Sequence, residues 1–268
     1  MHPGITSFSN PRVKHLVALR RRRTRDQYQE TLLEGYEELL LALDAAVRPK
    51  ILYCCPELTA SQGQATIERV AATGAEVIRL SRAVFDKVAY RESPDGWLAV
   101  VPAVPADLTA LTPGSRPLLL ICEGVEKPGN IGAMLRTADA AGVAGVIAAG
   151  PVTDWGNPNL IRASKGTVFS VPVASGSIDE VLHWLNERGI SIVVTTPDTD
   201  VLITDVDLTG PVAIAVGSEK FGLSAQFLAA AHTRAKIPMF GRADSLNVAT
   251  AAAIAIYEGV RQRMAPTP

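Results

Sequence analysis

Three segments in the second half of the chain combine glycine with polar side chains, and each follows an apolar run. They carry Asn130, Gly132 and Arg136 in residues 123–139, Gly217, Glu219 and Gly222 in residues 217–224, and Ser245 and Asn247 in residues 237–251. Glycine lets a ligand approach the backbone closely, and the polar side chains supply hydrogen bonds and charge. Loops that follow strands are where α/β sheets bind ligands, so these segments are candidate binding and catalytic loops.

Local structure offers a second explanation for each segment. Asn130 is a good N-cap for a following helix, and Arg136 is spaced to pair with Asp139 inside it. Ser224 can cap a helix after the second loop, and either Asp244 or Ser245 can cap the last helix, with Asn247 then in its first turn. Capping does not explain the tight pair of glycines around Glu219. The second loop is also no phosphate loop, because Leu223 stands where that motif requires lysine.

The loops need a scaffold, and the pattern of the chain predicts one. From residue 117 onward, apolar strand-like runs alternate with helical stretches, which predicts a parallel sheet covered by helices on both faces. Strands are expected at 117–122, 143–149, 167–173, 190–195, 212–216 and 235–238, and helices at 131–141, 179–188 and 245–263.

A smaller α/β unit is expected before this sheet. Helices are predicted at 11–23, 34–46 and 65–72, and strands at 50–54, 75–80 and 97–101. Clusters of Pro and Gly between residues 102 and 117 mark a linker. We therefore predict an N-terminal domain over 1–102, a linker over 103–116 and a second domain over 117–268.

Charge is distributed unevenly along the chain. Residues 1–25 hold seven Lys or Arg and no acid, so against a net charge of −1 the remainder carries −8. This asymmetry indicates a polyanionic partner such as RNA, or else a solvated helix face. Candidate phosphate contacts are Arg20, Arg21, Arg22 and Arg23, with Arg162 and Lys165 as a further pair that could equally be solvated.

The three cysteines argue against several other classes of protein. Cys54, Cys55 and Cys122 form no C-x-x-C spacing, so neither a disulfide framework nor a zinc site is expected, and no metal is predicted. The cysteine content suits a reducing cytoplasm. The longest apolar run, near residues 248–257, is far below the ~20 residues of a membrane span.

Taken together, the three loops resemble the signature motifs of the SpoU (TrmH) family of RNA ribose 2′-O-methyltransferases. Asn130, Gly132 and Arg136 match the first motif, and Gly217, Glu219 and Gly222 match the second. Residues 237–239, Gly241 and 245–248 match the third. Residues 9–14 and 34–35 resemble, more weakly, an L30e-like substrate-binding domain. The glycine-rich G-x-G-x-G loop of the more familiar methyltransferases is absent.

The resemblance implies a fold, a reaction and a set of site residues. It implies a trefoil knot in the C-terminal sheet (the SPOUT fold), a homodimer with its active site near the interface, and S-adenosyl-L-methionine as cofactor. The backbone near Thr195, Gly217, Ile237 and Leu246 would hold that cofactor. Arg136 would be catalytic, supported by Asn130, Glu219, Ser245 and Asn247. The substrate would be 23S rRNA, with a tRNA methyltransferase or an inactive RNA-binding homologue as alternatives.

Two roles for Arg136 remain open at this level: a general base or an electrostatic clamp. The side chain of arginine has an ordinary pKa of at least ~12.5, so its deprotonation at neutral pH costs on the order of 7 kcal/mol. This cost favours a clamp that binds the phosphate beside the target ribose and stabilises the developing alkoxide.

Overall fold

The computed structural model describes residues 4–59, 63–150 and 154–264, which form two compact units. The first unit runs up to Val104 and also includes Asp154–Ser170, and the second contains the rest. The predicted boundaries at 102 and 117 differ from this division chiefly at Asp154–Ser170. That segment lies within the second domain in sequence, but its contacts are with the first unit.

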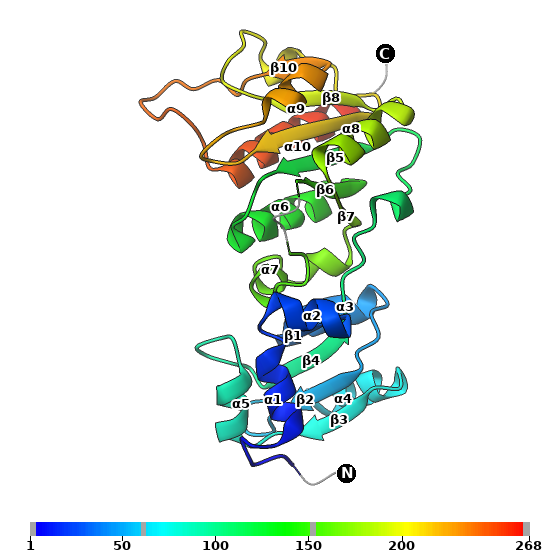
Figure 1. Ribbon diagram of the computed structural model, residues 1–268, viewed down its shortest axis with the longest axis vertical. Helices are drawn as coiled ribbons and strands as arrows, with labels where there is room; N and C mark the ends of the chain where they lie inside the picture. The colour runs from blue at the N-terminus through cyan, green and yellow to red at the C-terminus, as the bar shows by residue number, and fades with distance from the viewer. Residues whose placement is uncertain (1–3, 60–62, 151–153, 265–268) are drawn as a thin grey trace. The chain divides into compact units, whose positions relative to one another are not determined.

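The first unit is built on a mixed four-stranded sheet in the order β1–β4–β2–β3 (Figure 1). β4 (Trp97–Pro102) pairs antiparallel with β1 (Glu30–Glu34) and with β2 (Ile51–Cys54), and β2 pairs parallel with β3 (Glu76–Arg79). Its helices are α1 (Pro11–Ala18), α2 (Arg22–Tyr28), α3 (Tyr36–Asp44), α4 (Gly63–Ala72), α5 (Arg82–Val88) and α7 (Pro158–Ala163). The sequence did not predict β1, α5 or α7.

The single helix predicted over residues 11–23 is wrong, because the chain breaks between α1 and α2. The buried Arg25 side chain explains how the break is stabilised: its Nη1 donates to the carbonyl oxygens of Leu19 and Arg20, each at 2.9 Å. A charged donor thus satisfies carbonyls that a continuous helix would have bonded internally.

The strand predicted over residues 167–173 is also wrong. Residues Thr167–Phe169 form a short 3₁₀ turn in the first unit, and strand β7 (Val173–Gly176) begins only later, in the second. Gly166, directly before this turn, is in the left-handed region at φ +83°, and a Cβ there would lie 3.2 Å from the carbonyl oxygen of Glu38. The β-branched residues of this segment pack against α3 instead of pairing in a sheet.

The second unit is an all-parallel six-stranded sheet in the order β10–β8–β9–β5–β6–β7, as the alternating pattern predicts. Its other strands are β5 (Leu118–Glu123), β6 (Gly145–Ala149), β8 (Ser191–Thr195), β9 (Val212–Gly217) and β10 (Thr233–Ala235). Its helices are α6 (Pro128–Ala140), α8 (Ile178–Glu187), α9 (Ala225–Ala230) and α10 (Val248–Met264). Helix α9 directly follows Ser224, where the sequence offered a capped helix as one explanation of the second loop.

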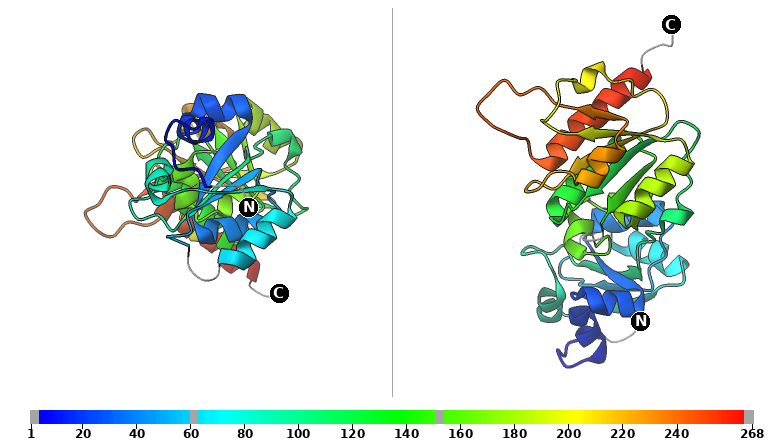
Figure 2. Two further views of the ribbon diagram at one scale, coloured as in Figure 1. Left: turned by 90° about the horizontal axis from the view of Figure 1, so that it is seen from below. Right: turned by 45° about the horizontal axis from the view of Figure 1, so that its top comes forward.

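Helices cover both faces of this sheet, which explains its uninterrupted apolar strands (Figure 2). Val181 and Leu185 of α8 and Phe227 of α9 pack in one core cluster with Leu119 and Ile121 of β5. Helices α6 and α10 pack together, and α10 also contacts β5 and β9. The chain runs β5–β6–β7 to one side and then returns to the other side of β5, so a topological switch point lies between β5 and β9.

Candidate active site

The carboxyl ends of β5 and β9 bring the first two motif loops together. The two strands pair in register, with Glu123 opposite Gly217 at their ends. The Glu123 carboxylate accepts a hydrogen bond from the backbone N–H of Ser224 at 2.7 Å, which links the two loops. Open α/β sheets bind ligands at such a switch point, so this is the first place to look for a site.

Gly217 and Gly222 form a tight turn that other residues could not adopt. The N–H of Gly222 donates to the carbonyl oxygen of Ser218 at 2.8 Å, and Gly222 has a φ of +65°. A Cβ on Gly217 would lie 2.1 Å from the carbonyl carbon of Gly222, so the two backbone segments touch. This contact explains the glycine pair that helix capping left unexplained, and it fixes the position of Glu219 between them.

The Glu219 carboxylate joins all three motifs through its hydrogen bonds. Oε1 accepts from Asn130 Nδ2 at 3.0 Å and from Asn247 Nδ2 at 2.8 Å, while Oε2 accepts from Lys127 Nζ at 2.5 Å. Asn247 Nδ2 also lies 3.2 Å from Asn130 Oδ1. These bonds, first those from Lys127 and Asn130, hold the pKa of Glu219 below its ordinary range. Glu219 is therefore an ionised acceptor that positions the loops.

Two local predictions about these residues need correction. Helix α6 begins at Pro128 after Lys127, so Asn130 lies inside the first turn and its side chain bonds Glu219 instead of capping. Helix α10 begins at Val248, and Asn247 Oδ1 accepts from the N–H of Ala249 at 3.0 Å. Asn247 is therefore the capping residue, in place of Asp244 or Ser245. Ser224 caps α9 as predicted, accepting from the N–H of Phe227.

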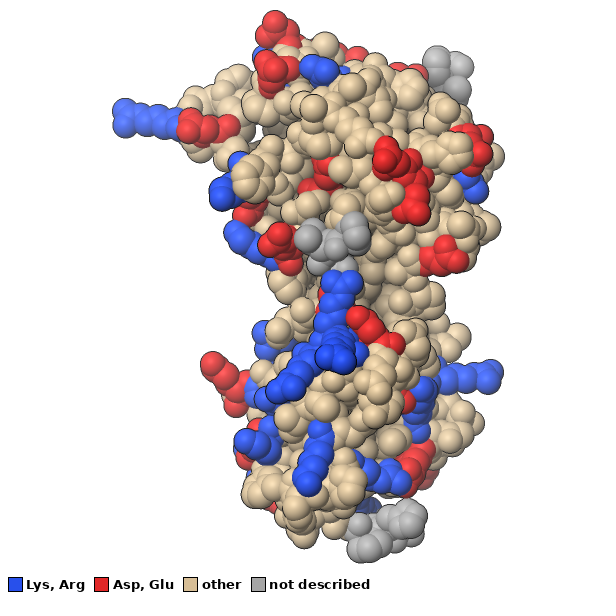
Figure 3. Space-filling model, viewed as in Figure 1, with Lys and Arg blue, Asp and Glu red and all other residues tan. Residues whose placement is uncertain are grey.

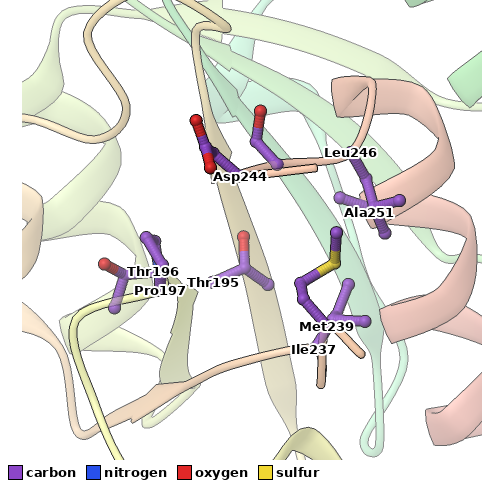
Figure 4. Close-up of a pocket in the computed structure, with 9 residues that line it drawn as sticks. Thr195, Thr196, Pro197, Ile237, Met239, Asp244, Leu246 and Ala251 are labelled. Carbon is purple, nitrogen blue, oxygen red and sulfur yellow. The ribbon is translucent and has the colours of Figure 1, made fainter. Parts of the chain in front are cut away.

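A pocket opens beside the third motif, and most of the predicted cofactor residues line it (Figure 4). Thr195, Ile237 and Leu246 lie in its wall, together with Ser245, whereas Gly217 does not. The wall is completed by residues that were not predicted by name: Thr196, Pro197, Met239 and Asp244 from the same two loops, and Ala251. Their signal was available, because Thr196 and Pro197 follow Thr195 directly and Met239 belongs to the Ile-Pro-Met motif.

The chemistry of this wall fits S-adenosylmethionine. Apolar side chains such as Ile237, Leu246 and Met239 suit the adenine ring, and Asp244 supplies one carboxylate for a positively charged group. Strand ends that leave backbone N–H and C=O groups free can supply the directional hydrogen bonds. No group of His, Cys, Asp and Glu within the described ranges is arranged to hold a metal ion.

Arg136 lies apart from the Glu219 cluster. It is exposed on α6, and its guanidinium makes no hydrogen bond or ion pair with any other described residue. Six residues separate it from Asn130, which turns it by about 240° around the helix from that side chain. Arg136 lines neither the pocket in Figure 4 nor the neighbouring cavity at the Glu219 loop.

The predicted RNA-binding cations divide into structural and free groups. Arg20 Nη2 donates to the last carbonyl oxygens of α5, including that of Ala89 at 2.9 Å, and its guanidinium lies 5.0 Å from the Tyr90 ring centroid. Lys165 lies 3.4 Å from a Glu37 oxygen. Arg21, Arg23 and Arg162 are exposed, and Arg22 is exposed beside Asp26 at 3.7 Å. Basic side chains gather around α1 and α2 on the face in Figure 3.

Two family models match the chain, and together they span most of its length. The model described as the SpoU rRNA Methylase family matches residues 117–257, and the one described as the MRM3-like substrate binding domain matches residues 10–99. Among the described residues, no helix is long and apolar enough to cross a membrane.

Named relatives and solved structures agree with these models. The chain is 36% identical over 212 residues to the 23S rRNA (guanosine-2′-O-)-methyltransferase RlmB of Coxiella burnetii, covering 76% of this chain and 84% of that protein. It is 30% identical over 253 residues to the 23S rRNA (guanosine(2553)-2′-O)-methyltransferase RlmP of Bacillus subtilis, covering 94% and 97%.

The fold of the whole chain is shared with a solved relative. An AdoMet-bound rRNA methyltransferase from Sinorhizobium meliloti superimposes with a TM-score of 0.90 at 30% identity, covering 98% of this chain and 99% of that one. The three motif loops meet at one sheet edge, and both halves of the chain match known family models. The chain belongs to the SpoU rRNA methylase family.

Proposed function

We propose that this chain methylates a ribose 2′-hydroxyl of 23S rRNA, using S-adenosylmethionine as the methyl donor. The observation that carries the proposal is the convergence of the three motif loops, joined by Glu219, beside a pocket formed by the ends of β8 and the third motif. Relatives named as 23S rRNA 2′-O-methyltransferases support the choice of substrate. Ribosomal RNA is cytoplasmic in bacteria, so we place the enzyme there.

The pocket residues Thr195, Ile237 and Leu246 would hold the cofactor, with Gly217 shaping the adjoining turn. When bound, S-adenosylmethionine supplies an electrophilic methyl group on a sulfonium. The ribose oxygen would take that methyl group, with the thioether as leaving group and the hydroxyl proton passing to solvent water. Ser245, at the pocket wall, would hydrogen-bond the ligand, and Asn130, Glu219 and Asn247 would fix the loops around it.

Arg136 would act as an electrostatic clamp. Its exposed guanidinium has no competing partner among the described residues, so it is free to take a phosphate of the substrate. Arg136 lines neither cavity of its own protomer. For Arg136 to contact the substrate, another copy of the chain or the RNA itself must bring the substrate to α6.

A homodimer supplies one way to do so. Ile254 and Tyr257 of α10 remain 40% and 47% exposed, three residues apart on one helix face, and α10 packs against α6. We propose that a second copy covers this face near Arg136. We also propose the trefoil knot of the family for the second unit, and RNA binding by the N-terminal domain over 1–102.

The test of function is a methylation assay. Purified protein is incubated with labelled S-adenosylmethionine and unmodified 23S rRNA transcript, 16S rRNA transcript or tRNA, and the product is mapped for 2′-O-methyl groups. One modified ribose in 23S rRNA is expected, absent with Arg136→Ala. Methylation of tRNA alone, of a base, or of no RNA despite cofactor binding would reject the proposal.

A further inference from the structure

A second cavity lies beside the Glu219 cluster, distinct from the pocket in Figure 4. It has a volume of about 330 Å³. Residues of the first two loops line it, including Lys127, Asn130, Glu219, Lys220 and Phe221. This volume falls within the roughly 300–1,000 Å³ of small-ligand sites.

The two cavities share one short segment of chain. Ser245 and Leu246 line the first cavity, and Val248 lines the second. Asn247, between them, bonds Glu219 in the wall of the second. Methyl transfer requires donor and acceptor atoms roughly 3 Å apart and in line, so the acceptor must bind next to the donor. The second cavity is therefore in the position that an acceptor site needs.

An exposed aromatic ring at the mouth of this cavity points to the kind of ligand. Phe221 is 78% exposed, although burial would be favourable for so large an apolar side chain. The ammonium of Lys220 lies 4.8 Å from the centroid of the Phe221 ring. An open aromatic face beside a cation matches an unpaired nucleotide, whose base stacks on the ring while its phosphate meets the charge.

Two acidic residues, Glu126 and Glu219, line the cavity, and two lysines in the same wall, Lys127 and Lys220, balance their charge. Both carboxylate oxygens of Glu219 are already bonded, one to Lys127 and the other to Asn130 and Asn247. We propose, resting on the methyltransferase function above, that this cavity receives the target nucleotide. Its base, out of the RNA stack, lies on Phe221, and Lys220 contacts an adjoining phosphate.

The first test compares aromatic and aliphatic replacements of Phe221. Base–aromatic stacking contributes on the order of 5- to 100-fold, so Phe221→Leu should slow single-turnover methylation of saturating 23S rRNA by about 10-fold. Phe221→Tyr should stay within about threefold of wild type. Val201→Ala, at an exposed apolar side chain (42%) that lines neither cavity, is the control and should not change the rate.

Three results would overturn the assignment in this assay. They are a wild-type rate for Phe221→Leu, an equal loss in Phe221→Tyr, or a change in cofactor affinity or oligomeric state for Phe221→Leu. The last would assign the ring to the cofactor site or to contact with another copy of the chain.

A second test does not depend on catalysis. The native Trp97, Trp155 and Trp184 are only 3%, 4% and 5% exposed, so a ligand that quenches by contact reaches mainly the indole introduced by Phe221→Trp. Single-stranded oligoadenylate of ten nucleotides should quench it, and adding Lys220→Ala should weaken that binding at least threefold. Absence of quenching would overturn the nucleotide site. Quenching by a protein that methylates no RNA would instead reject the proposed function alone.

Discussion

At the scale of single residues, the Glu219 carboxylate joins the three motif loops. Its lowered pKa, caused first by Lys127 and then by Asn130, means that folding favours the ionised form. Its contribution is thus complete above its ordinary pKa and is lost as the pH falls through the lowered value. At neutral pH the carboxylate stays charged, so it positions Asn130 and Asn247 and is no proton donor.

Arg136 offers a direct choice between base and clamp. Arg136→Lys keeps the charge but loses the planar fork, so a clamp predicts an activity about 10- to 100-fold below wild type. Arg136→Ala should lose about 100- to 1,000-fold, the range for removing one donor at a developing oxyanion. Single-turnover rates at saturating RNA, measured across pH, separate chemistry from binding.

Two results together would show that Arg136 is the base instead. They are a near wild-type rate for Arg136→Lys and an increase of that rate as the pH approaches the alkaline pKa of the lysine side chain. Cofactor affinity should barely change in either variant, because Arg136 is absent from the wall of the pocket in Figure 4.

Gly217 offers a steric test of the second motif. Gly217→Ala places a methyl group 2.1 Å from the backbone of Gly222, so the turn must open and Glu219 must move. We expect at least a 10-fold weaker affinity for S-adenosylmethionine and a comparable loss of activity, measured by calorimetry and methylation. The control Gly210→Ala has nothing within 4 Å of the new Cβ and should bind and react normally. Normal binding by Gly217→Ala would show that the turn is adaptable.

At the scale of elements, Asp154–Ser170 is a part of the first unit supplied from within the second domain's sequence. Helix α7 packs against β1, and Thr31 Oγ1 donates to the carbonyl oxygen of Gly156 at 2.5 Å. The side chain of Arg25, only 5% exposed, forms an ion pair with Asp154. An N-terminal fragment ending near residue 104 would lose these contacts and leave the apolar side chains of β1 less well covered.

Arg25 gives a stability test of this arrangement. Replacing it leaves a largely buried Asp154 carboxylate and two backbone carbonyl oxygens without their donor. Arg25→Met should therefore lower the free energy of unfolding by about 3 kcal/mol in urea denaturation. Arg22→Met is the matched control, since Arg22 is 53% exposed with a 3.7 Å ion pair, and its change should stay within about 0.5 kcal/mol. Equal effects would mean that the Asp154 contact contributes little.

At the scale of the whole molecule, the uneven charge matches an enzyme whose substrate is a large polyanion. The seven cations of residues 1–25 belong to the unit matched by a substrate-binding model, whereas the acids that balance them are spread over the rest. The structure refines which of them can bind RNA. Arg12, Arg20 and Arg25 are occupied by Glu76, by helix ends and by Asp154. Lys14, Arg21, Arg22 and Arg23 are exposed, and of these Arg22 makes a 3.7 Å ion pair with Asp26.

Replacing Arg21, Arg22 and Arg23 with Ala should weaken RNA binding and reduce the slope of log K against log salt. Each lost phosphate contact lowers that slope by about 0.7 to 0.9 because fewer counterions are released. Filter binding to a 23S rRNA transcript between 50 and 300 mM salt measures it. The single-turnover rate at saturating RNA should be unchanged, since these residues lie outside the catalytic unit. An unchanged slope would place the RNA elsewhere.

The sequence by itself determined the architecture of the second unit and the identity of its loops. Parallel strands buried on both faces read as continuous apolar runs, so β5, β6, β8 and β9 were predicted within two residues. The motif residues were recognisable because their types and spacing are fixed by close backbone approach, as at Gly217. Four of the residues that line the pocket in Figure 4, Thr195, Ile237, Ser245 and Leu246, are among the predicted site residues.

Only the tertiary structure decided which side chains meet. Asn130, Glu219 and Asn247 are separated by up to 117 residues, and their mutual bonds depend on the return of the chain to the far side of β5. The same holds for Arg25, whose side chain bonds the carbonyl oxygens after α1 and forms an ion pair with Asp154. In each case a long-range partner overrides a plausible local one: capping for Asn130, a continuous helix for residues 11–23, a strand for 167–173. Local patterns cannot reveal such partners, because the energy that selects them comes from contacts made only in the folded chain.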